Sequence, residues 1–209
     1  MPRGDPAGAG DLSAPAASVK QLRETRIDSE VVFEGGFLKV RRDRVRLPDG
    51  RPSQREFVVH PGAAAMVPIF PDQRILIERQ FRYPLGQVFV EVPAGKLDPG
   101  ESALQTAQRE LVEETGYRAD EWAFLTRLHT AIGFSDEAID VFLCRDLVHT
   151  GQALDDGEFL EIEIVTLGWL IDELRAGRLT DVKTQIVTFW LERIFSGAWP
   201  WPEFDRIKP

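Results

Sequence analysis

Three short, mostly apolar runs follow one another between residues 63 and 95. They read AAAMVPIF, RILIERQFRY and QVFVEVPAG, and turn residues such as Pro71-Asp72 and Pro84-Leu85-Gly86 separate them. Runs of this length with few polar interruptions are typical of strands that are buried on both faces. The pattern predicts the sheet of a layered domain in this part of the chain.

The third run leads into a predicted helix at Ser102–Thr115. The turn Asp98-Pro99-Gly100 precedes it, and Ser102 with Gln105 matches a capping box. Gly116 follows the helix, in the position where a left-handed residue costs least. At about 100° per residue, one face of this helix is apolar and is expected to pack on the sheet. That face carries Leu104, Ala107 and Leu111.

The remaining part of the chain repeats strand and helix patterns. Further strands are expected at 123–129, 139–145 and 161–166, and closing helices at 167–176 and 182–196. Strands, a helix, more strands and closing helices predict an α/β or α+β domain that is built in layers.

A smaller unit is expected before this domain. Strand-like runs at 30–33, 37–47 and 53–60 are broken by Gly35-Gly36 and by Asp49-Gly50, and the latter is a strong hairpin signal. The residues before them are rich in Pro and Gly and lack periodicity, which is typical of a disordered or weakly ordered tail. We therefore divide the chain into a tail at 1–28, a small antiparallel β-sheet subdomain at 29–61 and a main domain at 62–209.

Composition narrows the setting in which the chain works. Its 209 residues, 43% of them apolar, suit one domain with a small appendage, and a net charge of −9 opposes binding to nucleic acid and anionic membranes. The single cysteine, Cys144, allows no internal disulfide and no cysteine-based zinc site. Because no apolar run reaches membrane-spanning length and no signal-peptide pattern is present, we expect a cytoplasmic protein.

The predicted helix at Ser102–Thr115 crowds three carboxylates, Glu110, Glu113 and Glu114, around one arginine, Arg109. Like charges four residues apart destabilise a helix by about 0.2–0.5 kcal/mol, and here they lie toward its negative end. Arg109 can offset Glu113, but nothing local offsets the other two. A divalent cation such as Mg²⁺ would, because it prefers carboxylate oxygens and shares its shell with substrate phosphates. Spacing alone leaves a solvated acidic face open as the alternative.

The surrounding residues resemble the Nudix box, the signature of hydrolases that act on nucleoside diphosphates linked to another moiety. The pattern G-x5-E-x7-R-E-(aliphatic)-x-E-E-x-G-(apolar) is matched throughout from Gly95 to Tyr117. The resemblance implies a sandwich of a mixed sheet between helices. It also implies Mg²⁺ ions, with Mn²⁺ as a possible substitute, bound by Glu110, Glu113, Glu114 and a backbone carbonyl near Ala94. Structural roles in the box fall to Gly95, Glu101, Arg109 and Gly116.

Two further segments, RQFRYP at 79–84 and EVPAGKLDPGE at 91–101, resemble the ADP-ribose pyrophosphatase branch of this family, as does the small N-terminal sheet. The resemblance implies Mg²⁺-dependent hydrolysis of ADP-ribose to AMP and ribose 5-phosphate by a homodimer whose subunits exchange the small sheet. Arg82 and Glu91 would face the substrate, Arg55 would reach the partner's site and Phe37 would stack on adenine. Packing in the small sheet is the alternative for Phe37, and a surface salt bridge is the alternative for Arg55 and Arg82.

In this branch the general base is often an acidic residue on a late loop. The stretch LDDGEFLEIEI offers Asp155, Asp156 and Glu158, of which Glu158 is our first choice and Asp156 the second. Glu113 is the alternative, if Glu110 and Glu114 suffice to bind the metal.

The chain departs from the branch in the loop HTAIGFSDE, where Thr130 and Ile132 stand in place of the usual prolines. We expect this loop to be more flexible, which would admit a related substrate. One alternative is a Nudix pyrophosphatase that acts on an ADP-sugar, a GDP-sugar, NADH or a dinucleoside polyphosphate. The other is a sensor that binds ADP-ribose-like ligands without cleaving them, a type that is often fused to a DNA-binding segment. The intact carboxylates argue against a sensor, and the acidic charge argues against DNA contact.

Overall fold

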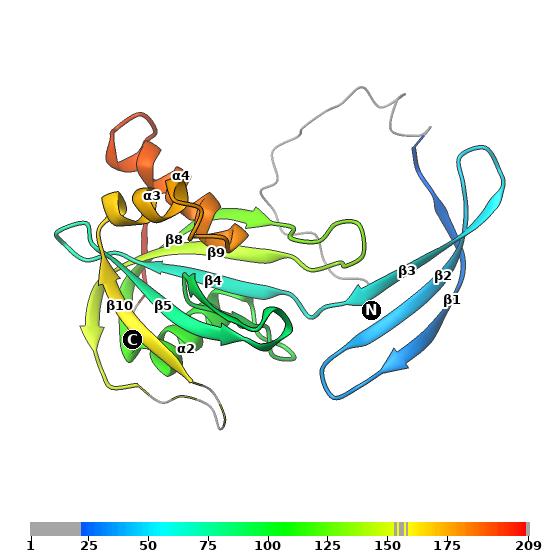
Figure 1. Cartoon of the computed structure of the whole chain (residues 1–209), viewed down its shortest axis with the longest axis horizontal. Helices are drawn as coiled ribbons and strands as arrows, with labels where there is room; N and C mark the ends of the chain where they lie inside the picture. Colours follow the sequence, from blue (N-terminus) through cyan, green and yellow to red (C-terminus); the bar gives the residue numbers. More distant parts are fainter. Residues whose placement is uncertain (1–21, 153, 155–156, 158, 208–209) are drawn as a thin grey trace. The chain divides into compact units, whose positions relative to one another are not determined.

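The computed structural model describes residues 22–207 apart from 153, 155, 156 and 158 (Figure 1). The chain divides into two compact units, one reaching to Val59 and the other beginning at His60. Each unit has its own sheets, and they are described in turn.

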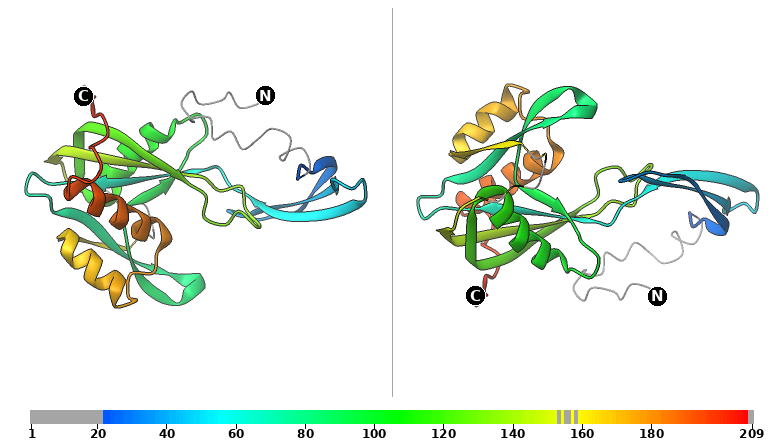
Figure 2. Two further views of the ribbon diagram at one scale, coloured as in Figure 1. Left: turned by 90° about the horizontal axis from the view of Figure 1, so that it is seen from above. Right: turned by 90° about the horizontal axis from the view of Figure 1, so that it is seen from below.

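The described residues of the larger unit form two sheets and three α-helices. One sheet has the order β10-β5-β6 and the other β11-β8-β9-β4-β7, in which only β4 and β9 run parallel. Figure 2 shows α2 on one side of the second sheet and α4 on the other. The strands are β4 Ala63–Pro68, β5 Ile75–Arg82, β6 Gln87–Glu91, β7 Ala94–Lys96, β8 Tyr117–Leu128, β9 Ile139–His149, β10 Leu160–Val165 and β11 Asp205–Arg206. The helices are a 3-10 turn η1 at Tyr83–Leu85, then α2 Ala103–Thr115, α3 Leu167–Arg175 and α4 Val182–Phe195.

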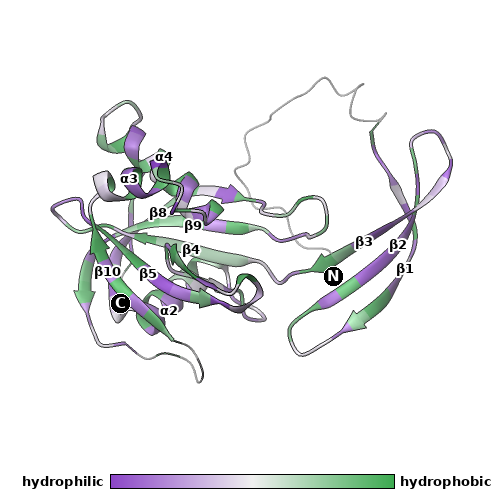
Figure 3. Ribbon diagram, viewed as in Figure 1, coloured by the Kyte–Doolittle hydropathy of each residue, from purple (hydrophilic) through white to green (hydrophobic). Residues whose placement is uncertain are grey.

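The smaller unit is a three-stranded antiparallel sheet made of β1 Thr25–Glu34, β2 Lys39–Arg46 and β3 Pro52–Val59. Strand β2 is strongly hydrophilic (Figure 3). Its arginines pair with acids on the neighbouring strands, as in Arg44 with Asp28 and Arg42 with Glu56. Ion pairs of this kind stabilise a sheet in place of apolar contacts. Strand β1 begins at Thr25, which pairs with Arg46 of β2, inside the range for which the sequence predicted a tail; residues 1–21 of that range lie outside the described residues.

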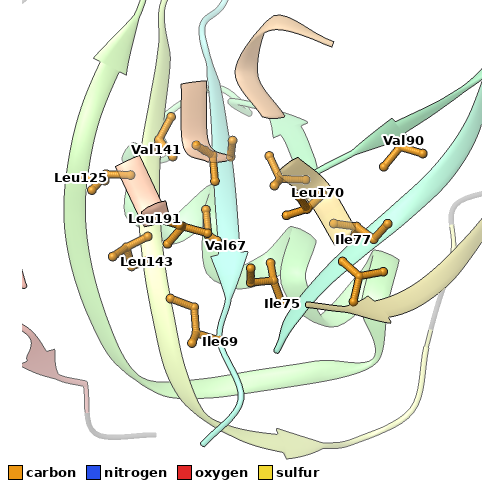
Figure 4. Close-up of a cluster of buried hydrophobic side chains, with 14 of the residues drawn as sticks. Val67, Ile69, Ile75, Ile77, Val90, Leu125, Val141, Leu143, Leu170 and Leu191 are labelled. Atoms are coloured by element: carbon orange, nitrogen blue, oxygen red, sulfur yellow. The ribbon is translucent and has the colours of Figure 1, made fainter. Parts of the chain in front are cut away.

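Strand β4 is buried on both faces, as its apolar run predicts. Because successive side chains of a strand point to opposite faces, Ala64 and Met66 pack with α2 while Val67 joins the core against α3 and α4 (Figure 4). The Val67 side chain lies in one core with Leu170 of α3 and Leu191 of α4. The mixed sheet therefore lies between helix layers, which confirms the predicted α/β/α sandwich.

Helix α2 begins and ends where the sequence predicts. Ser102 is its N-cap: the Gln105 amide donates to Ser102 Oγ at 3.3 Å, and Gln105 Oε1 accepts from the Ser102 amide at 2.9 Å. Gly116 follows with φ 71°, and a Cβ there would lie 2.7 Å from the backbone nitrogen of Gln152. The start of α2 depends on a side-chain cap and its end on a glycine.

We expect Ser102→Ala to lower the free energy of unfolding by about 1 kcal/mol, because the Gln105 amide at the start of α2 loses its acceptor, Ser102 Oγ. Urea denaturation measures the change. Ser196→Ala is the matched control, since Ser196 Oγ donates only to the Arg193 carbonyl at an exposed position, and it should stay within about 0.5 kcal/mol of wild type. Equal stability of the two variants would show that the cap does not stabilise α2.

Candidate active site on helix α2

Three carboxylates of α2 form the centre of the candidate site. Glu110 and Glu113 are partly buried, and Glu114 is only 3% exposed. Ionised side chains are rarely buried to this degree unless they bind a cation or accept several hydrogen bonds. Their burial argues against the solvated acidic face that spacing alone left open.

The side chain of Glu110 packs directly against the backbone of Gly95 in β7. A Cβ added to Gly95 would lie 1.9 Å from the carboxyl carbon of Glu110. Only a residue without a side chain leaves this space, so Gly95 lets the Glu110 carboxylate lie against the backbone of β7. The same strand carries Ala94, whose carbonyl is the predicted backbone ligand.

Arg109 connects these carboxylates to the loop before the helix. Its Nη1 donates to Glu110 Oε1 at 2.9 Å and to Glu113 Oε2 at 2.8 Å, while Nε and Nη2 donate to the two oxygens of Glu101 at 3.1 Å. The hydrogen bonds to Glu101 are the main cause that raises the pKa of Arg109, and in return they lower the pKa of Glu101. This geometry is what the structural role predicted for Glu101 and Arg109 requires.

The candidate donors on α2 and β7 are carboxylate and carbonyl oxygens, the atom types that hard divalent cations prefer. In the part of the chain that the structure describes, no group of three or more His, Cys, Asp or Glu side chains lies close enough to hold a metal ion. Glu110 and Glu113 instead converge on one guanidinium nitrogen, Arg109 Nη1. Two carboxylates that already share one cationic group, beside a backbone brought close by Gly95, present the oxygen ligands that Mg²⁺ or Mn²⁺ prefers.

A second cluster joins the ends of β5 and β6 to the start of α4. Glu91 accepts from Arg82 Nε at 2.6 Å and from Arg82 Nη2 at 2.8 Å, and it also accepts from Lys183 Nζ. Burial alone would raise the pKa of Glu91, but Arg82 and Lys183 outweigh it and hold that pKa below its ordinary value. The structure thus brings together Arg82 and Glu91, both predicted to face the substrate.

Lys183 was not among the predicted site residues, although its spacing carries a signal. It lies four residues before Val187 and eight before Leu191, on the buried stripe of α4. A lysine on such a stripe is predicted to be buried and paired.

The other predicted residues are placed as follows. Phe37 and Arg55 belong to the smaller unit, where Phe37 is 61% exposed and Arg55 forms an ion pair with Glu24. This ion pair is the surface contact weighed as the alternative for Arg55. Asp156 and Glu158, the first choices for the general base, lie outside the described residues.

The loop that lacks the usual prolines is tied by hydrogen bonds. Thr130 Oγ1 donates to Glu137, and the His60 amide donates to Asp136 Oδ1 at 2.7 Å. A proline at position 130 has no hydroxyl and could not make the first of these bonds. Ile132, by contrast, is largely exposed at the tip.

Comparisons with known proteins identify the family of this chain. The family model described as "NUDIX domain" matches residues 59–184, and the one described as "Nucleoside diphosphate sugar hydrolase N-terminal domain" matches residues 24–58. The chain belongs to the Nudix family and is a Nudix hydrolase.

Two relatives cover most of the chain. It is 39% identical over 176 residues to the ADP-ribose pyrophosphatase of Bacillus subtilis (strain 168), covering 83% of this chain and 95% of that one. It is 38% identical over 175 residues to the methanol dehydrogenase activator of Bacillus methanolicus, with the same coverage. The crystal structure of an ADP compounds hydrolase shares the fold, with a TM-score of 0.74, 21% identity, and coverage of 85% of this chain and 97% of that one. Among the described residues no helix is long and apolar enough to cross a membrane.

We expect Gly95→Ala to displace the Glu110 carboxylate while the fold persists, because the group in its way is the end of a flexible side chain. Binding of Mn²⁺, followed by electron paramagnetic resonance, should weaken by roughly tenfold or more. Gly168→Ala is the matched control, since its new Cβ would meet only Thr166 Oγ1 at 3.8 Å. Unchanged Mn²⁺ affinity in Gly95→Ala would contradict the assignment of Glu110 as a ligand.

Proposed function

We propose that this protein hydrolyses the pyrophosphate bond of ADP-ribose to AMP and ribose 5-phosphate, using Mg²⁺ bound on α2. The observation that carries the proposal is the convergence of Glu110 and Glu113 of α2 on Arg109 Nη1, with Glu110 packed against Gly95 of β7. The relative named ADP-ribose pyrophosphatase, which this chain matches over nearly its whole length, supports the choice of substrate.

Each part of the site has a proposed role. Glu110, Glu113, Glu114 and the carbonyl near Ala94 would hold the metal, which when bound would neutralise charge on the pyrophosphate and make a water more acidic. Arg82, 41% exposed beyond its pair with Glu91, would donate to a phosphate oxygen of the substrate. In the reaction, a water oxygen bonds to one phosphorus, the bridging P–O bond breaks, and a carboxylate takes the proton. Glu158, Asp156 and Glu113 remain the proposed bases, in that order.

The direct test is turnover on a panel of nucleoside diphosphate substrates, with Mg²⁺ and with chelator. Metal-dependent release of AMP, preferentially from ADP-ribose, supports the proposal, and a preference for another substrate would overturn the choice of ADP-ribose. NADH is the second candidate, because it contains the same adenosine diphosphate group and one relative is named as the activator of a dehydrogenase. Tight binding of ADP-ribose without turnover would support a sensor instead.

We expect Glu114→Gln to remain folded and to lose turnover. Loss of an outer-sphere partner of a metal site typically costs about 10- to 100-fold, so loss of a ligand should reduce kcat by more than about 100-fold. The fold should persist, because the change relieves repulsion among the α2 carboxylates. Glu192→Gln, at an exposed position of α4, is the charge-matched control. Near-normal kcat of Glu114→Gln at saturating Mg²⁺ would contradict the metal site.

We also propose a homodimer, in which Arg55 and Phe37 of one subunit reach the site of the other, and a cytoplasmic location, where the buried thiol of Cys144 stays reduced. The small sheet exposes several large apolar side chains, and exposed apolar patches of this kind are typical of protein–protein contacts. These side chains are Ile27, Val31, Val32, Phe33, Phe37 and Leu38.

We expect Phe33→Glu to convert the dimer to a monomer, because a charge would replace an apolar ring at the subunit contact. Light scattering at micromolar concentration gives the mass of each species. Glu30→Ser, a polar change on the same strand, is the control and should remain dimeric. A monomeric mass for the wild-type protein would count against the proposal.

A further inference from the structure

Lys183 is a buried lysine at the start of α4. Its side chain is 7% exposed, and its ammonium group pairs with Glu91 and, at 3.1 Å, with Asp181. Burial of an ammonium group lowers the stability of the fold unless acidic groups pair with it, and Lys183 is paired with two carboxylates.

Lys183 binds the same oxygen that receives Arg82. Glu91 Oε2 accepts both from Lys183 Nζ and from Arg82 Nη2, and Glu91 Oε1 accepts from Arg82 Nε. Glu91 therefore holds Arg82 along its Nε–Nη2 edge. Among the described residues no acceptor pairs with Arg82 Nη1, so its hydrogens can be donated to an anionic ligand.

Three acidic side chains, Glu91, Glu78 and Asp181, act on the charge of Arg82. Glu91 stands directly opposite Glu78 in the β5–β6 register, and both side chains are buried. Like charges opposite one another destabilise a sheet, and Arg82 and Lys183 are two cations near this pair. Lys183 adds a second positive charge at Glu91 and Asp181, so that these acidic groups neutralise less of the charge of Arg82.

We propose that Lys183 is a positioning residue for Arg82: it shares the charge of Glu91, so that Arg82 stays oriented and electrostatically available for a phosphate group of the substrate. The proposal rests on the proposed function, in which Arg82 contacts the pyrophosphate. It predicts that Lys183 acts on substrate binding through Arg82 and has little influence on the chemical step at α2.

The test is steady-state kinetics of Lys183→Met on ADP-ribose at saturating Mg²⁺. We expect KM to rise roughly tenfold, the cost of about one charge-assisted contact, while kcat changes by less than about threefold. Lys183→Arg, which keeps the charge, should restore KM to near the wild-type value. The combination of Arg82→Ala with Lys183→Met should raise KM no further than Arg82→Ala alone.

Thr188→Val controls for stability. Thr188 is buried on the same helix, where its hydroxyl donates to the Thr184 carbonyl at 2.8 Å. This variant should lower the melting temperature without changing KM. If Lys183→Met does not fold, Lys183→Gln, which keeps a donor but loses the charge, replaces it under the same criteria.

The outcomes separate the two proposals. Wild-type protein that does not hydrolyse ADP-ribose overturns the proposed function. Wild-type activity together with an unchanged KM in the Lys183 variant overturns the role of Lys183. Additive effects in the double variant also overturn it, because Lys183 would then act independently of Arg82.

Discussion

The candidate site depends on the close approach of one acidic side chain to one backbone. Glu110 of α2 lies against Gly95 of β7, in a space that a single methyl group would fill. Strand β7 is in turn hydrogen-bonded to the buried strand β4. The position of the Glu110 carboxylate is therefore set by the central sheet. The position of α2 along that sheet decides where a metal ion could be held.

The packing of α2 makes this approach possible without loosening the helix. Leu111 and Ala107 on its apolar face join Met66 of β4 in a dry cluster, while Arg109 on the other side holds Glu101, Glu110 and Glu113. Burial of the apolar face stabilises the helix, and the arginine offsets the repulsion that its acidic residues create.

Features fixed by local sequence could be predicted. The cap at Ser102, the stop at Gly116 and the buried run of β4 depend on neighbouring residues, and each is found as expected. The start of β1 was missed, because its first residues are placed by pairing with β2, which the local pattern of the segment does not show. Lys183 was missed for a similar reason, since its partner Glu91 lies 92 residues away in the chain.

Those distant contacts extend the candidate site beyond the Gly95–Tyr117 box. The first turn of α4 contacts the end of β6 at two residues. Lys183 pairs with Glu91, the last residue of β6, and Thr184 Oγ1 accepts from the amide of the next residue, Val92, at 2.9 Å. Asp181 caps that turn through the Thr184 amide and hydroxyl. The chain runs from Val92 through Pro93 directly into Ala94 of β7. The segment that lies beside Glu110 is thus held by α2 at one end and by α4 at the other. A change at Thr184 would reach the candidate metal site through this segment, whereas a change at Lys183 would reach the substrate through Arg82.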